Sequence, residues 1–216
     1  MVIQSDIIRN VEKLEGVKAI LLYGSFARGE EDSLSDVDIM VIIDNPEIKE
    51  SIKEELKELN PTITTVNGIA ETIKLYPSTI VMLKEAVLLY GTLPEIPEPR
   101  KEDFLREINE ALKIFEINEG LLNEIGEEAT STIIYSCILR ARQAYIIKCL
   151  IRKEKMTKKG FIEELKKIGI KPEYYDYYRL ARDDKLNITL PNHRLKRLIR
   201  AVRRYVRKVR EEVKKY

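Results

Sequence analysis

The order of strand-like and helix-like segments is the feature that most restricts the fold of this 216-residue chain. Four short apolar runs alternate with segments of helical periodicity in the first part of the chain: residues 17–23, 37–43, 62–66 and 87–90. Such alternation is typical of an α/β arrangement. From Glu102 onward no strand pattern remains, so we expect the second part to be entirely helical.

Capping signals set several of the expected helix boundaries. Asn45 followed by Pro46 predicts a helix start, and the apolar spacing carries that helix to about Leu59. The spacing of Ile3 to Leu14 predicts an earlier helix that Gly16 closes. The remaining predicted helices cover residues 69–85 with a break at Pro77, 102–118, 127–152, 158–168, 172–183 and 192–214.

A proline-rich connector separates two parts of opposite charge. Pro94, Pro97 and Pro99 prevent helix formation and favour an extended chain. Residues 1–100 carry a net charge of −8 and the remainder +10, although the whole chain has only +2. We therefore expect an acidic domain at 1–93, a linker at 94–100 and a basic helical domain at 101–216.

Composition narrows the class of protein. No apolar run approaches the ~20 residues that span a bilayer, and the first residues are too charged for a signal peptide. Cys137 and Cys149 lie about 18 Å apart along one predicted helix and cannot form a disulfide within it. We expect a soluble cytoplasmic protein with two buried thiols. Abundant Lys, Glu, Arg and Ile, with few Gln and no Trp, indicate a thermophile.

The residues that suggest chemistry lie between the first two predicted strands. Gly24 lets a ligand approach the backbone closely, and the hydroxyl of Ser25 can donate to a phosphate oxygen at the start of a short helix. Asp36 and Asp38 begin the next strand, where residues two apart face the same side. Two neighbouring carboxylates suit Mg²⁺. The alternative is a solvated acidic loop, which the combination of strand, turn and spacing makes less attractive.

This signature resembles the active site of the DNA polymerase beta-like nucleotidyltransferase superfamily. The stretch Gly-Ser-Phe-Ala-Arg-Gly-Glu at 24–30 is similar to that of minimal nucleotidyltransferases. The two-part plan resembles kanamycin nucleotidyltransferase and fusions of a minimal nucleotidyltransferase with a HEPN-like bundle. The resemblance implies an α/β (α+β) nucleotidyltransferase domain with a mixed sheet, followed by an all-α helical bundle.

The resemblance also implies roles for individual residues. Gly24 and Ser25 would hold the phosphates of a nucleoside triphosphate, expected to be ATP, and Asp36 and Asp38 would bind two Mg²⁺ ions. A hydroxyl acceptor would then attack the α-phosphorus and expel pyrophosphate. The acceptor stays open among a small molecule, a protein tyrosine and an RNA end. Arg28 would contact phosphate, or else form an ion pair with Glu31 or Asp32.

One departure from the family pattern concerns a third carboxylate, which the superfamily usually carries on a neighbouring strand. The expected strand, Pro61 to Val66, contains no acidic residue. The candidates elsewhere are Glu71, Glu127, Glu128, Asp183 and Asp184. A second hypothesis follows, in which the chain is a catalytically weak or inactive module that binds nucleotide or nucleic acid.

Three features of the second part have both a functional and a structural interpretation. The predicted helix at 191–216 has a net charge of +9, which suits a solvated face but also nucleic acid. His193, the sole histidine, is expected to open that helix, with a catalytic role as the less favoured alternative. Tyr174, Tyr175, Tyr177 and Tyr178 are expected to pack against the bundle, with base stacking as the alternative. A homodimer is possible and a membrane partner is not expected.

Overall fold

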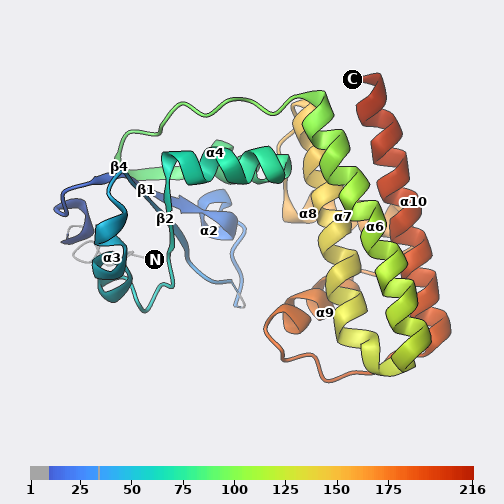
Figure 1. Ribbon diagram of the computed structural model, residues 1–216. Helices are drawn as coiled ribbons and strands as arrows, with labels where there is room; N and C mark the ends of the chain where they lie inside the picture. The colour runs from blue at the N-terminus through green and yellow to red at the C-terminus, as the bar shows by residue number, and fades with distance from the viewer. Residues whose placement is uncertain (1–9, 34) are drawn as a thin grey trace. The chain divides into compact units, whose positions relative to one another are not determined.

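The structure is a computed structural model that describes residues 10–33 and 35–216 (Figure 1). It contains two compact units, one ending at Pro99 and the other beginning at Arg100. The helix predicted from Ile3 to Leu14 falls mostly outside the described residues. The two units are described separately below.

The first unit is built on a four-stranded mixed sheet. Its strands are β1 (Val17–Tyr23), β2 (Asp38–Ile43), β3 (Thr62–Thr65) and β4 (Val87–Gly91), in the spatial order β3-β2-β1-β4. β1 pairs antiparallel with both β2 and β4, whereas β3 runs parallel to β2. The predicted α/β domain with a mixed sheet is therefore confirmed.

Alternation along β2 divides its side chains between two buried faces. Ile39, Val41 and Ile43 pack in one apolar cluster with Ile52 and Leu56 from the chain around α3 (Lys49–Glu55). Met40 and Ile42 are equally buried, on the other face of the strand. The strand is apolar on both sides, and Asp38 at its first position is its one acidic residue.

Turn chemistry sets the ends of the helices in this unit. The Asn45 side chain accepts a hydrogen bond from the Glu47 N–H, and this cap starts the turn η1 (Pro46–Ile48) that leads into α3. Helix α3 ends at Glu55 rather than the predicted Leu59, because Asn60 takes a positive φ and Pro61 follows it. The remaining elements are α2 (Gly24–Arg28), α4 (Val66–Leu75), η2 (Pro77–Thr79) and α5 (Ile80–Lys84).

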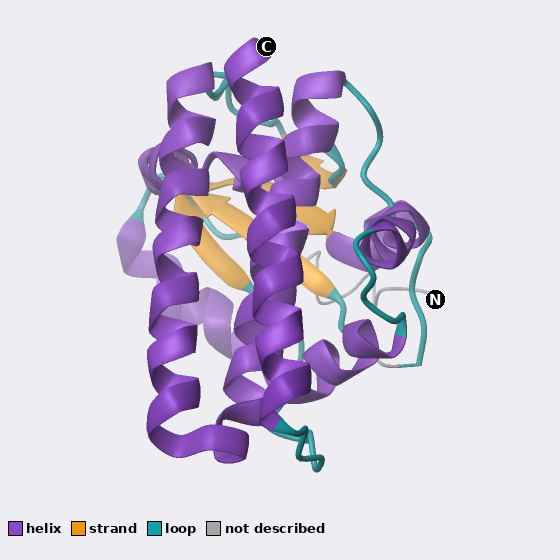
Figure 2. Ribbon diagram, turned by 90° about the vertical axis from the view of Figure 1, so that its right-hand side faces the viewer, coloured by secondary structure: helices purple, strands orange, loops and turns teal. Residues whose placement is uncertain are grey.

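The second unit is helical throughout, as predicted. Its elements are α6 (Lys101–Ile125), η3 (Gly126–Ala129), α7 (Thr130–Arg152), α8 (Lys158–Lys167), α9 (Glu173–Arg182) and α10 (Asn192–Lys215). The long helices α6, α7 and α10 pack side by side (Figures 1 and 2). Helix α6 continues past the predicted end at Asn118 because Gly120 is tolerated there, and the left-handed Gly126 ends it.

Apolar residues at helical spacing hold α10 in the bundle. One stripe of the helix is buried: Leu195, Leu198, Ile199, Val202, Val206, Val209 and Val213. The thiols of Cys137 and Cys149 are buried in α7 and unbonded to each other. In the part of the chain that the structure describes, no helix is both long and apolar enough to cross a membrane.

Candidate functional site

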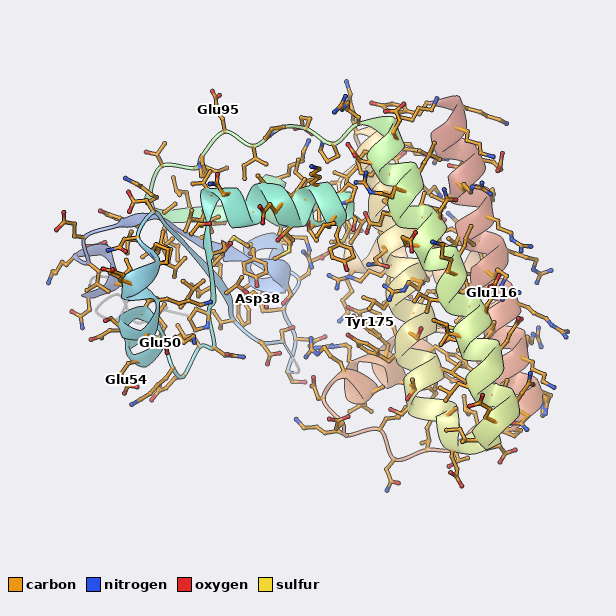
Figure 3. The ribbon with its side chains drawn as sticks, in the orientation of Figure 1. Asp38, Glu50, Glu54, Glu95, Glu116 and Tyr175 are labelled. Carbon is orange, nitrogen blue, oxygen red and sulfur yellow. The ribbon has the colours of Figure 1, made fainter. Side chains whose placement is uncertain are left out.

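The turn from β1 into α2 is packed directly against the first residue of β2. Gly24 has a φ of +75°, in the left-handed region that favours glycine. A Cβ atom added to Gly24 would overlap the carboxylate of Asp38. Only glycine therefore lets the chain turn at this point while the acid keeps its place. Figure 3 shows Asp38 beside α2.

Asp36 lies outside the strand that was predicted to begin with it. β2 starts at Asp38, whose partner across the sheet is Tyr23, the last residue of β1. Because Gly24 turns the chain away into α2, the preceding residues have no strand to pair with, and the ladder stops. Asp36 is accordingly exposed, whereas Asp38 is half-buried. The two acids occupy different environments, which the i, i+2 rule alone did not predict.

Ser25 stands at the second position of a helix only five residues long. Its side chain makes no hydrogen bond to any of the described residues, so the hydroxyl can bond to a ligand. A helix this short carries only a small dipole. Any attraction for phosphate at this turn therefore depends more on the Ser25 hydroxyl and the backbone N–H groups of the turn than on the helix dipole.

Tyr23 is a neighbour of Asp38 that the sequence pattern did not reveal. Its hydroxyl lies 3.0 Å from the Thr62 hydroxyl oxygen, so the side chain reaches across β2 to β3. Burial raises the pKa of the Tyr23 hydroxyl; the bond to Thr62 opposes this rise and the charge of Asp38 adds to it. The phenol therefore stays protonated and neutral beside the acid. Strand pairing is the signal that could have identified this residue, since Tyr23 faces Asp38 in the antiparallel register.

Arg28 forms ion pairs, but with partners other than those predicted. Its Nε lies 2.8 Å from a Glu30 oxygen, and its Nη1 lies 3.2 Å from a Glu85 oxygen. The Arg28 side chain is only 10% exposed. The expected alternatives, Glu31 and Asp32, are exposed loop residues. Glu85, which directly follows α5, could not have been paired with Arg28 from sequence spacing.

No third carboxylate stands on the strand beside β2. Thr62 pairs with Met40, two residues after Asp38, so Thr62 and Asp38 lie on the same face of the sheet. Nowhere in residues 10–33 and 35–216 do three or more metal-ligating side chains come together. The other candidates are all exposed, on α4, in η3 and after α9: Glu71, Glu127, Glu128, Asp183 and Asp184.

The tyrosine cluster and the single histidine of the helical unit both have structural roles. Tyr178 is buried and stacks on Tyr135 with ring centroids 5.4 Å apart, and Tyr175 contacts Phe161 edge-on. The packing interpretation of these two tyrosines is confirmed. His193 is the exposed second residue of α10, where it opens the helix as expected.

Comparison with known proteins supports the fold described above. None of the curated proteins is a detectable match to the sequence. Over most of its length the chain resembles the solved structure of spectinomycin adenyltransferase from Enterococcus faecialis, a structure that contains ATP and spectinomycin. The TM-score is 0.53 at 13% identity, over 94% of this chain and 98% of that one. This likeness shows a shared fold.

A family comparison covers the unit that contains Gly24 and Asp38. Residues 5–90 match the family described as nucleotidyltransferase domain. The match includes the turn, both acidic residues and all but the last residue of the sheet. The first unit of this chain is thus a nucleotidyltransferase domain, of the DNA polymerase beta-like kind that its signature resembles.

Proposed function

We propose that this protein is a Mg²⁺-dependent nucleotidyltransferase that moves a nucleoside monophosphate from a triphosphate, ATP in the first instance, to a hydroxyl acceptor. The observation that supports the proposal best is the contact between Gly24 and Asp38. It joins the turn suited to phosphate and the acid suited to a metal ion in one site.

The donor set suits magnesium. Asp36 and Asp38 offer carboxylate oxygens, which are hard ligands of the type that Mg²⁺ prefers. Because Gly24 has no side chain, the Asp38 carboxylate packs directly against the β1–α2 turn, so a metal ion on that carboxylate would lie next to the turn. Bound Mg²⁺ would neutralise charge on the triphosphate and on the departing pyrophosphate.

The chain's own residues would bind and orient the reactants. The Ser25 hydroxyl would donate to a phosphate oxygen, and Gly24 would let the phosphate approach the backbone. Arg28 would add positive charge near them. The acceptor oxygen would bond to the α-phosphorus as the bond to the β-phosphate oxygen breaks, and the released group is pyrophosphate.

A small hydroxylated molecule is the acceptor class we favour. The support is the similarity in fold to an adenyltransferase whose structure contains both ATP and spectinomycin. A protein tyrosine and an RNA end are the competing acceptors. Incubation of the full chain with α-labelled ATP, Mg²⁺ and each acceptor class would show which one takes up label.

The test of the site compares acids at the two ends of one strand. Asp38→Asn should lower pyrophosphate release about 100-fold or more, because it removes a charge that the transition state requires. Asp44→Asn is the matched control, since Asp44 follows the other end of β2 and pairs with Lys18 at the surface. Equal activity in Asp38→Asn and the unmodified protein would exclude the proposed mechanism.

A second candidate function is a nucleotide-binding module without turnover. The observation in its favour is the identity of Thr62 on β3, which lies on the same face of the sheet as Asp38. The family usually has a carboxylate on this neighbouring strand. On this hypothesis, calorimetry would detect triphosphate binding that needs Mg²⁺ and Asp38, while no acceptor would take up label. Catalytic turnover with any acceptor would rule it out.

A further inference from the structure

Two hollows lie along α10 in the helical unit and meet at one small residue. The first encloses about 410 Å³ beside the α8–α9 connection, and the second about 460 Å³ beside α7 and α8. Ala201 of α10 lines both. The two hollows therefore adjoin at a small side chain, and together we call them the α10 groove.

The α10 wall of this groove carries a row of cations. Arg194, Arg197, Arg204 and Lys208 line it at the spacing of successive helical turns. Across fourteen residues the row extends about 21 Å. None of the four forms an ion pair with a residue that the structure describes. Their positive charge is therefore available to a ligand.

The acidic residues of the α10 groove are already neutralised by other cations. Glu164 lies 2.7 Å from the Lys148 nitrogen and 2.8 Å from that of Lys167. Glu212 lies 2.7 Å from Arg152, outside the groove. The remaining acid, Glu173, is within 3.7 Å of Lys171. These contacts leave the arginines and Lys208 of α10 as the dominant charge.

A buried hydroxyl in the second hollow lacks a partner. Tyr205 is only 5% exposed, and its hydroxyl makes no hydrogen bond within the described part of the chain. Burial strongly raises the pKa of this phenol, so it stays protonated and can donate. An unpaired buried donor is costly, and an anionic acceptor in the hollow would satisfy it.

We propose that the α10 groove binds the phosphate backbone of a single-stranded polynucleotide. A row of cations about 21 Å long exceeds what one triphosphate can occupy but suits several successive phosphates. Tyr174, whose half-buried ring lines the first hollow, offers a surface for a base. Cations that follow a groove together with aromatic rings are typical of single-strand binding. This site is separate from the nucleotidyltransferase domain and does not depend on its activity.

The test compares two double variants on the same helix. Arg197→Gln with Arg204→Gln removes two groove charges. Arg200→Gln with Arg207→Gln removes two exposed charges of α10 that line neither hollow. Fluorescence anisotropy of the full chain with labelled oligo-uridine and oligo-thymidine, in EDTA and without nucleotide, measures the affinity of each. The two probes distinguish RNA from DNA.

We expect the groove variant to reduce affinity at least tenfold more than the control variant. Its slope of log affinity against log salt should fall by about 1.4, because each single-strand phosphate contact contributes roughly 0.7. Equal losses in both variants would overturn the proposal in favour of diffuse attraction to a basic helix. Absence of binding at low salt, or tighter binding of a duplex of equal length, would also overturn it.

Tyr205→Phe provides a second, independent test. The substitution keeps the ring and removes only the unpartnered hydroxyl, so the unfolding midpoint should stay the same or rise. Affinity for the oligonucleotide should drop roughly tenfold, the value of one hydrogen bond to a charged group. Unchanged affinity would show that the hydroxyl takes no part in binding and would contradict this hollow's place in the groove.

Discussion

Gly24 of the β1–α2 turn and Asp38 of β2 are in contact, with no room for a single methyl group between them. They are fourteen positions apart in sequence, and the Tyr23–Asp38 pair of the antiparallel ladder brings them together. The glycine thus has two separate functions: it permits a left-handed backbone, and it lets the Asp38 carboxylate pack directly against the turn. Only the second concerns the proposed chemistry.

Gly24→Ala and Gly29→Ala should separate these two functions. Both glycines have a positive φ, so either substitution should cost about 1–2 kcal/mol of stability. A Cβ at Gly29 meets nothing within 4 Å, whereas one at Gly24 overlaps Asp38. We expect loss of triphosphate binding only in Gly24→Ala, measured by calorimetry with Mg²⁺. Equal binding by both variants would contradict the site.

Arg28 should show both a structural and a binding contribution. Its ion pair with Glu85 joins α2 to the end of α5, with both side chains largely buried. A double-mutant cycle with Arg28→Met and Glu85→Gln should therefore give a coupling of about 1 kcal/mol or more in the free energy of unfolding. In turnover assays, Arg28→Met should raise KM for the triphosphate roughly tenfold. If KM does not change, Arg28 only supports the fold.

Much of the fold could be predicted because local chemistry and packing agree. Val17–Tyr23 was bounded correctly by its apolar run and Gly24. The break at Pro77 followed from the missing N–H of proline. The helix predicted over 102–118 continues to Ile125, because burial of the apolar stripe of α6 outweighs the small propensity cost of Gly120.

The site was harder to predict because its geometry depends on strand pairing. The sequence indicated Gly24, Ser25, Asp36 and Asp38 as a group, and the structure packs Gly24 against Asp38. It did not indicate that β2 begins at Asp38, nor that Tyr23 reaches Thr62. Both features require the sheet order and register, which local periodicity does not contain.

Thr62→Asp should increase activity. The substitution places a carboxylate on β3, on the face of the sheet that also carries Asp38 of β2, where it would accept the proton of the acceptor hydroxyl. We expect at least about a tenfold gain in pyrophosphate release, given that general base catalysis contributes roughly 100-fold or more. Thr62→Asn is the control of matched shape without charge. The same rate in both variants would mean that the base comes from elsewhere.

Glu164 should make the stability of the helical unit depend on pH. Burial by itself raises the pKa of this carboxyl, but the hydrogen bonds from Lys148 and Lys167 outweigh it, so the pKa lies below its usual 4.5. A group whose pKa is lower in the folded state stabilises the protein at pH values above its pKa in the unfolded chain. This stabilisation is lost as the pH falls through the pKa of the folded state. The loss should therefore appear below about pH 4.5.

Urea unfolding of Glu164→Gln and Glu163→Gln measures this contribution. At pH 7 the first variant should lose about 2 kcal/mol, because Lys148 keeps its charge in a site where its side chain is only 14% exposed. The difference from the unmodified protein should shrink as the pH falls below 4.5 and Glu164 itself becomes protonated. Glu163 pairs with Lys166 at the surface, where water screens the two charges, so its substitution should change stability little at any pH. A pH-independent loss in Glu164→Gln would show that packing, and not charge, accounts for its effect.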